Sequence, residues 1–254
     1  MPILLDRRMS QKEDLMLLYG KNSVLERLKR NPASIGKISL QDNFALSSIE
    51  ELIKANNIPV ERLPSRELAR IKPAKDLQGI VARVDRFEYT AFDDLLSRPQ
   101  DRRLTLIFLD RINDPHNLGV IIRTVACFGE SALVVPKFKA CEVNETVLHV
   151  ASGGENYVPV ALVSNLSNAI IKAKGRGYWI MGAVLESEVE DVSKISLPFP
   201  LALVLGSEGE GIRYGIQKHL DIKARIPMKG AKLSFNVNMA CAIFCHEISK
   251  QKHT

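Results

Sequence analysis

The sequence predicts an α/β protein in two parts, a small N-terminal α/β sandwich domain and a larger domain with a mostly parallel sheet. Short apolar runs alternate with amphipathic helical stretches in both parts, as expected of strands and helices that pack in layers. In the second part the apolar runs are unbroken, which is typical of strands buried on both faces of a parallel sheet. Between the parts, residues 87–103 are charged, include Pro99 and show no sustained period, so we interpret them as a linker.

The first domain is expected at residues 15–86, after a polar leader at 1–14. Ser47, followed three residues later by Glu50, has the pattern of a capping box at a helix start. Helices are predicted from 19–24 to about 30, at 47–56 and at 65–71, and strands at 35–40, 60–62 and 78–84.

The second domain is expected at residues 104–254. Asn117 is a candidate N-cap for its first helix and Gly129 ends that helix, while Ser234 or Asn236 is a candidate cap for the last one. Strands are predicted at 106–109, 132–135, 158–162, 178–183, 201–205 and 222–226, and helices at 117–128, 164–174 and from 237 onward.

The composition is that of an ordinary globular protein, with 46% hydrophobic and 25% charged residues among 254. No apolar run reaches the length of a membrane span, and the charged N-terminus is unlike a secretion signal, so we expect no membrane partner. The four cysteines, Cys127, Cys141, Cys241 and Cys245, form no Cys-x-x-Cys pair, which argues against a metal site or disulfide bonds. We therefore expect a reducing, cytoplasmic location.

The net charge of +6 is concentrated near the N-terminus, where residues 1–86 carry sixteen Lys and Arg against eleven Asp and Glu. The predicted first helix directs Lys21, Arg27, Lys29 and Arg30 outward, which indicates a face that binds a polyanion. From charge alone, an ordinary solvated surface explains this face equally well.

Two predicted strands lead into loops that are suited to a ligand. Residues 201–205 are followed by a glycine-rich loop at 206–211, and residues 222–226 by a short loop at 227–230. Ligands of α/β proteins usually bind at such strand ends. Because the last helix begins shortly afterwards, these segments predict a small-molecule site.

The order of the glycines in this loop excludes the common nucleotide motifs. Gly206, Gly209 and Gly211 give G-x-x-G-x-G, the reverse of the dinucleotide fingerprint, and the chain has no phosphate-binding P-loop motif. The carboxylates of Glu208 and Glu210 would repel a pyrophosphate. A ligand with a neutral or cationic core therefore fits this loop better.

Arg123 stands out on the first helix of the second domain because it follows three apolar residues, Val120, Ile121 and Ile122. Burying a guanidinium without partners costs several kcal/mol. The side chain either reaches the surface or an acidic partner, or is held at a cleft to meet phosphate or an oxyanion.

Three motifs carry a family resemblance. They are DPHNLGVIIRT at 114–124, LVLGSEGEG at 203–211, and IPM with Gly230 and LSFNV at 226–237. In this order they resemble the SpoU (TrmH) family of RNA ribose 2′-O-methyltransferases, in the SPOUT superfamily. In that family leucine usually stands at the position of Phe235 and a small residue at that of Asn238. Two further stretches, YGKNSV at 19–24 and LQGIVARV at 77–84, resemble the L30e-like substrate-binding domain of members that methylate a guanosine of large-subunit ribosomal RNA.

The resemblance implies a SPOUT α/β domain whose C-terminal segments thread through a loop to form a deep trefoil knot, at strand ends near Gly182, Gly206 and Met228. It also implies a homodimer that binds S-adenosylmethionine and needs no metal. Arg123 would be the catalytic residue, assisted by Asn117, Glu208, Ser234 and Asn236. The cofactor would lie on Gly182, Leu205, Gly206, Ile226, Met228 and Phe235.

Arginine is always protonated in proteins, so we expect Arg123 to orient a phosphate and stabilise the developing alkoxide rather than to act as a base. Transfer RNA is the alternative substrate, although the members that act on it typically lack this N-terminal domain. A non-catalytic RNA-binding assembly factor and a nicotinamide-binding protein are the alternatives from other classes.

Overall fold

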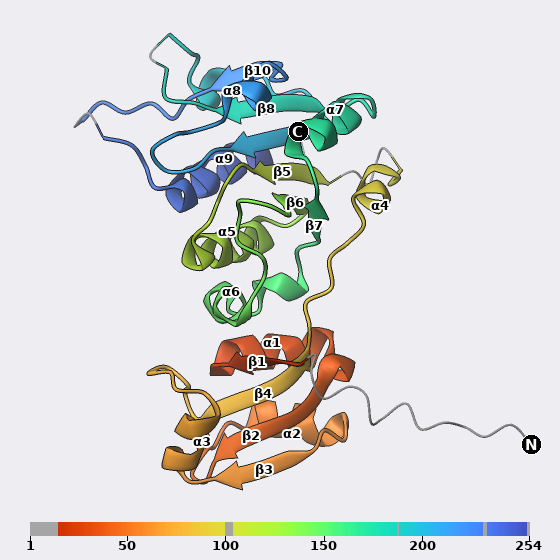
Figure 1. Cartoon of the computed structure of the whole chain (residues 1–254), viewed down its shortest axis with the longest axis vertical. Helices are drawn as coiled ribbons and strands as arrows, with labels where there is room; N and C mark the ends of the chain where they lie inside the picture. The colour runs from red at the N-terminus through yellow and green to blue at the C-terminus, as the bar shows by residue number, and fades with distance from the viewer. Residues whose placement is uncertain (1–14, 100–103, 187, 231–232, 253–254) are drawn as a thin grey trace, which may run out of the picture. The chain divides into compact units, whose positions relative to one another are not determined.

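The computed structural model describes residues 15–99, 104–186, 188–230 and 233–252, so the leader expected at 1–14 lies outside the described residues. The chain forms two compact units, Met1–Glu88 and Tyr89–Thr254, drawn in Figure 1 in red to orange and in yellow to blue. Each unit is an α/β structure with its own sheet.

The first unit has a four-stranded mixed sheet in the order β1-β4-β2-β3. Strands β1 and β2 both run antiparallel to β4, and β3 runs parallel to β2. No strand is predicted from the sequence where β1 lies. The elements are β1 (Leu15–Tyr19), α1 (Lys21–Arg30), η1 (Pro32–Ser34), β2 (Ile35–Gln41), α2 (Ser47–Ala55), β3 (Val60–Leu63), α3 (Ser65–Ile71) and β4 (Ile80–Asp85).

The second unit confirms the predicted parallel sheet, with six strands in the order β10-β8-β9-β5-β6-β7 and every neighbouring pair parallel. Its strands are β5 (Thr105–Leu109), β6 (Ser131–Pro136), β7 (Val160–Val163), β8 (Trp179–Ala183), β9 (Leu201–Leu205) and β10 (Ile222–Ala224). Its helices are α4 (Phe92–Leu96), α5 (Pro115–Phe128), α6 (Glu145–Ala151), η3 (Gly154–Asn156), α7 (Leu166–Lys174), η4 (Val192–Lys194), α8 (Tyr214–Gln217) and α9 (Val237–Lys252).

Helices cover both faces of this sheet, which explains why its strands are apolar throughout. Leu106 and Phe108 of β5 pack into a core with α4, α7 and α8. Ile107 and Leu109 alternate with them and are also fully buried, so they face the opposite side of the sheet. Helices α6 and α9 both pack against α5.

Three local features differ from the sequence-based expectation. The segment interpreted as a linker contains α4, whose Leu95 and Leu96 are buried in the core of the second unit. Helix α5 begins at Pro115 with Asp114 as its cap, because the Asp114 side chain accepts the His116 N–H at 2.9 Å. Asn117 is therefore inside the first turn, and its amide is available for other contacts. Strand β10 ends at Ala224, so Ile226 belongs to the loop.

Candidate functional site

A cavity of about 420 Å³ opens at the carboxyl ends of three neighbouring parallel strands, β8, β9 and β10. Its volume is within the usual range of small-molecule sites. The start of α9 closes it from another side. The lining residues come from all these segments: Ala183, Val184, Leu185, Leu205, Gly206, Ser207, Glu208, Gly209, Gly211, Ile226, Met228, Ser234, Phe235, Asn236, Val237, Ala240 and Phe244.

The glycine-rich loop after β9 folds back on itself beside this cavity. The Gly211 N–H donates to the Ser207 carbonyl at 3.0 Å, and a Cβ added to Gly206 would lie 2.1 Å from the Gly211 carbonyl carbon. Gly209 and Gly211 adopt φ values of 90° and 65°, which disfavour residues with a Cβ. The loop therefore requires glycine for its backbone geometry, and it exposes backbone groups to the cavity.

Glu208 is the centre of a polar network at the rim of the cavity. Its Oε1 accepts a bond from Asn117 Nδ2 at 3.0 Å and another from Asn236 Nδ2 at 2.5 Å. Asn238 Nδ2 donates to Asn117 Oδ1 at 2.7 Å, and the Asn238 N–H donates to Asn236 Oδ1 at 2.8 Å. These four side chains join the starts of α5 and α9 to the glycine loop.

The structure thus brings together three of the residues singled out in the sequence, Asn117, Glu208 and Asn236. Ser234 lines the same cavity and is exposed, as is Phe235. Of the residues expected to hold a cofactor, Leu205, Gly206, Ile226, Met228 and Phe235 line the cavity.

Gly182 lies next to the cavity rather than in its lining. A Cβ at this position would lie 2.4 Å from Leu220 Cδ1. Glycine therefore allows Leu220, which lies between α8 and β10, to pack closely on β8. The cavity is reached instead by the three residues that follow, Ala183, Val184 and Leu185.

Arg123 does not line this cavity within a single chain, and its catalytic role stays a prediction. It is exposed on α5, in a separate hollow with Val120, Thr124, Cys127, Phe128 and Val150. Arg123 follows Asn117 by six residues, which places the two side chains about 120° apart around the helix and roughly 9 Å apart along it. The two residues therefore cannot point at the same spot.

The basic face expected on α1 is formed by three residues instead of four. Lys21, Lys29 and Arg30 are exposed, and Lys29 pairs with Glu26 at 2.8 Å. Arg27 is only 5% exposed, and its Nη1 donates to Ser34 Oγ at 3.2 Å. The expectation that Arg27 points outward is wrong, because its helical position is on the same side as the buried Val24 and Leu28.

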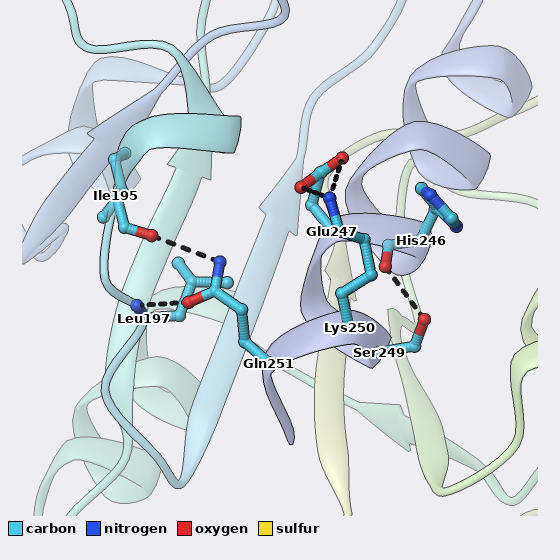
Figure 2. Close-up of polar contacts among 7 residues, drawn as sticks. All are labelled: Ile195, Leu197, His246, Glu247, Ser249, Lys250 and Gln251. Atoms are coloured by element: carbon cyan, nitrogen blue, oxygen red, sulfur yellow. Dashed lines mark hydrogen bonds and ion pairs between the residues drawn. The ribbon is translucent and has the colours of Figure 1, made fainter. Parts of the chain in front are cut away.

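Helix α9 is held in place at its far end, which fixes the direction of its start. Figure 2 shows Gln251 bonding twice to the segment before β9: its Oε1 accepts the Leu197 N–H at 2.9 Å, and its Nε2 donates to the Ile195 carbonyl at 3.2 Å. On the same helix, Cys241 and Cys245 are buried with their sulfurs 3.9 Å apart. Their hydrogen bond and burial raise the pKa of the Cys241 thiol well above its usual value, which suits a neutral packing role.

Sequence reasoning missed the contacts of two residues near the site: Asn238, noted only as a departure from the family pattern, and Asp110, whose carboxylate accepts the Arg213 N–H at 2.9 Å after the glycine loop. Asn238 offered no motif of its own, since its role depends on the distance of α9 from α5. Asp110 follows a buried strand directly, which is a signal that could have been used. Among the helices of the described residues, none combines the length and apolar character of a membrane crossing. Within the same ranges, no three His, Cys, Asp or Glu side chains gather to hold a metal ion.

Known protein families match both parts of the chain. Residues 104–246 match the SpoU rRNA Methylase family, and residues 17–90 match the family described as RNA 2'-O ribose methyltransferase substrate binding. A relative from Coxiella burnetii, named 23S rRNA (guanosine-2'-O-)-methyltransferase RlmB, is 36% identical over 241 residues, covering 92% of this chain and 95% of the relative.

A second relative, the Bacillus subtilis protein YacO, is assigned to the TrmH family of tRNA/rRNA methyltransferases. It is 32% identical over 250 residues, covering 96% of this chain and 98% of the relative. Among solved structures, the SpoU methyltransferase AviRb from Streptomyces viridochromogenes, in complex with AdoMet, superposes with a TM-score of 0.79 at 19% identity. That match covers 98% of this chain and 94% of AviRb, and it supports the fold.

Proposed function

The chain belongs to the SpoU rRNA methylase family, and on this premise we propose that it transfers a methyl group from S-adenosylmethionine to a ribose 2′-hydroxyl of RNA, with a guanosine of large-subunit ribosomal RNA as its target. The observation that carries the proposal is the position of Glu208. Its carboxylate is held by two amides at the rim of a cavity large enough for a nucleoside-sized cofactor.

The chemistry of the cavity suits S-adenosylmethionine. Apolar side chains of Leu185, Phe235 and Val237 offer surface to an adenine ring, and backbone groups of the glycine loop offer hydrogen bonds. The carboxylate of Glu208 favours a ligand with a cationic centre. Leu205, Gly206, Ile226, Met228 and Phe235 would hold the cofactor, which when bound supplies an electrophilic methyl group.

The residues of this chain would then align and activate the ribose hydroxyl. Methyl transfer is an in-line displacement, so the hydroxyl oxygen must be positioned and must lose its proton. Glu208 accepts the hydrogen bonds of both asparagine side-chain amides on Oε1. Within the described part of the chain, its Oε2 therefore has no hydrogen-bond partner. We assign Oε2, together with the Ser234 hydroxyl and the Asn236 amide, to holding the ribose hydroxyl.

Arg123 has a different part in the proposal because it is outside the cavity. It would bind the phosphate next to the target ribose, and it would do so in a homodimer, where the partner's α5 could bring it to the site. The exposed apolar side chains beside it, Phe128 among them, and the exposed Met239 of α9 are suited to contact between two copies.

Three further features complete the proposal. The first unit, through Lys21, Lys29 and Arg30, would bind the RNA backbone, since phosphate contacts position a protein on RNA without reading sequence. A ribosomal RNA substrate would place the protein in the cytoplasm. The strand ends near Gly182, Gly206 and Met228 would form the trefoil knot that the family resemblance implies.

The experiment is methyl transfer in vitro. The wild-type protein, labelled S-adenosylmethionine and deproteinised 23S ribosomal RNA from cells that lack this protein should give one methylated ribose at a guanosine. Glu208→Ala should lower kcat by roughly 100-fold, while Asn168→Ala, an exposed asparagine on α7, should leave it unchanged. Transfer to transfer RNA instead would reassign the substrate. Cofactor binding without transfer to either RNA would favour the assembly-factor alternative.

A further inference from the structure

Residue 238 holds both amides that face Glu208. The Asn238 backbone N–H donates to Asn236 Oδ1 at 2.8 Å, and its side-chain Nδ2 donates to Asn117 Oδ1 at 2.7 Å. Each of these acceptors belongs to an amide whose nitrogen donates to Glu208 Oε1. The two contacts therefore fix which end of each amide points toward the carboxylate.

The direction of these amides matters because an ionised carboxylate accepts hydrogen bonds and donates none. A side-chain amide that rotated by 180° would present its oxygen to Glu208 and repel it. For Asn117, the contact that prevents this rotation is the Asn238 donor. Asn238 Oδ1 is buried and meets no donor among the described residues. A buried oxygen without a hydrogen bond destabilises the folded state. The structure accepts this loss at Asn238 Oδ1 while the Nδ2 of the same side chain donates to Asn117.

We propose that Asn238 is a positioning residue of the methyltransferase site, which keeps the Asn117 amide turned toward Glu208 so that Oε2 stays directed at the ribose hydroxyl. This inference rests on the proposed role of Glu208. Asn238 itself does not line the cavity, and neither does Asn117. Its loss should therefore change the rate of transfer and leave cofactor affinity nearly unchanged.

Two variants and a double-mutant cycle test the proposal. Asn238→Ala removes the donor, and we expect kcat to fall roughly tenfold with the Kd for S-adenosylmethionine within about twofold of wild type. Asn238→Asp is nearly isosteric but can only accept, so it should draw Asn117 Nδ2 away from Glu208 and lower kcat further than alanine does. In the Asn117→Ala background, Asn238→Ala should cause no additional loss, because its target is already absent.

Asn168→Ala is the matched control, since it removes an amide from an exposed helix position in the same unit. Full kcat in both Asn238 variants, or additive losses in the double variant, would overturn the inference. Calorimetric cofactor binding shows whether each variant is folded, and the aspartate variant carries the comparison if the alanine variant melts early. A wild-type protein that transfers no methyl group would refute the proposed function instead, and this inference with it.

A second, independent observation concerns the loop after β6. Phe138 is 65% exposed and stands between two exposed lysines, with Lys137 Nζ 5.9 Å from the centre of its ring. The backbone around it is anchored, because the Lys137 N–H donates to the Val163 carbonyl at 2.8 Å and the Cys141 N–H donates to the Ile112 carbonyl at 2.9 Å. The Phe138 ring is therefore exposed to solvent on a loop whose backbone is fixed by hydrogen bonds.

The loop follows the carboxyl end of β6, and the cavity opens at the carboxyl ends of strands in the same parallel sheet. Strand β6 is two positions from β9, or about 10 Å across the sheet. Unstacked RNA bases bind to exposed aromatic rings, and flanking lysines hold the phosphates. We propose that Phe138 is a stacking site for an unpaired base close to the methylated nucleotide, with Lys137 and Lys139 on the adjoining phosphates. This inference rests on RNA being the substrate.

The test measures affinity for the 23S ribosomal RNA used in the methylation assay. Phe138→Ala should weaken RNA binding roughly tenfold. Phe138→Tyr should bind RNA as the wild type does, since tyrosine keeps an aromatic ring. Lys137→Ala with Lys139→Ala should reduce the slope of log affinity against log salt by about 1.4. Unchanged affinity in Phe138→Ala would overturn this inference alone. Loss of a dimer in sedimentation would show that Phe138 contacts a second copy and would also overturn it. A wild-type protein that does not bind RNA would refute the proposed function.

Discussion

Asp110 and Arg213 join the end of β5 to the segment that follows the glycine loop. Asp110 is fully buried, and its Oδ2 accepts the Arg213 backbone N–H at 2.9 Å while its Oδ1 accepts Arg213 Nε at 2.8 Å. The Asp110 N–H in turn donates to the Leu205 carbonyl at 2.8 Å. Asp110 therefore holds both ends of the loop that lines the cavity, one through its backbone N–H and the other through its carboxylate.

Removing this carboxylate should loosen the loop as well as the fold. Asp110→Ala leaves the Arg213 backbone N–H and its partly exposed guanidinium without their acceptor, and we expect the free energy of unfolding to fall by about 1–3 kcal/mol. Urea denaturation measures this loss. Lys223→Ala, which breaks the more exposed pair with Glu186, is the control and should cost less than about 1 kcal/mol. Equal losses in the two variants would contradict the role given to Asp110.

Gly206 should tolerate no side chain. In Gly206→Ala the new Cβ would meet the backbone of Gly211, so the loop must open and the cavity must change shape. We expect at least a tenfold loss of S-adenosylmethionine affinity in calorimetry. Gly215→Ala is the matched control, because a Cβ there meets no atom within 4 Å. Normal cofactor binding by Gly206→Ala would show that the loop can rearrange at little cost.

Arg123 should act across the dimer if two copies share a site. Arg123→Ala and Glu208→Ala proteins are each expected to be nearly inactive, with cofactor affinity retained in Arg123→Ala because the residue does not line the cavity. If the two variants are mixed and allowed to exchange subunits, half of the dimers are mixed and each has one intact site. Activity should then recover to about a quarter of wild type. No recovery would place both residues at a site within one chain. Arg123→Lys adds a test of geometry, because lysine lacks the planar, two-pronged donor set.

The basic face of α1 should contribute to RNA binding through charge. Replacing Lys21, Lys29 and Arg30 by alanine should lower RNA affinity and make it less dependent on salt, by about 0.7 in the log–log slope for each lost phosphate contact. Arg27→Ala should instead lower thermal stability, because its guanidinium is buried against Ser34. If the triple variant binds RNA as the wild type does at every salt concentration, the face is only a solvated surface.

Glu61 should make the first unit sensitive to acid. Hydrogen bonds from Lys37 and Ser39 to its carboxylate lower the pKa of Glu61 below its usual value of 4.5. The folded state therefore binds this proton less readily than the unfolded state, so the stabilisation is present above about pH 4.5 and is lost as pH falls through the folded pKa. Thermal melts between pH 7 and pH 3 should show a smaller acid-induced loss in Glu61→Gln. Identical pH profiles would contradict this assignment.

Periodicity was sufficient to predict the parallel sheet of the second unit and most of its helices, because continuous apolar runs such as 201–205 have few other uses in a globular protein. It failed for short elements such as β1 and α4, whose residues become strand and helix through packing on the rest of their unit. At the site, the glycine loop and Glu208 could be found from sequence because their residue types are unusual there.

The positions of Asn238 and Arg123 could not be found in the same way. Asn238 contacts Asn117 across 121 positions of the chain, a distance that no local pattern encodes. Arg123 belongs to a matching motif, but the motif does not say which face of α5 carries the guanidinium. Helix geometry gives the angle between Asn117 and Arg123. It does not say which of the two faces the cavity, because that depends on the segments that pack around α5.

The hydrogen-bonded asparagines around Glu208 draw on the beginning of the second unit and on its final helix. A polypeptide emerging from the ribosome can therefore complete its β5–α5 segment, which carries Asn117, and its glycine loop before the carboxylate acquires its second amide donor, Asn236. Activity should appear only when the last helix has been synthesised and has docked. The protein is therefore expected to be catalytically inactive during its own synthesis, until α9 has packed against α5.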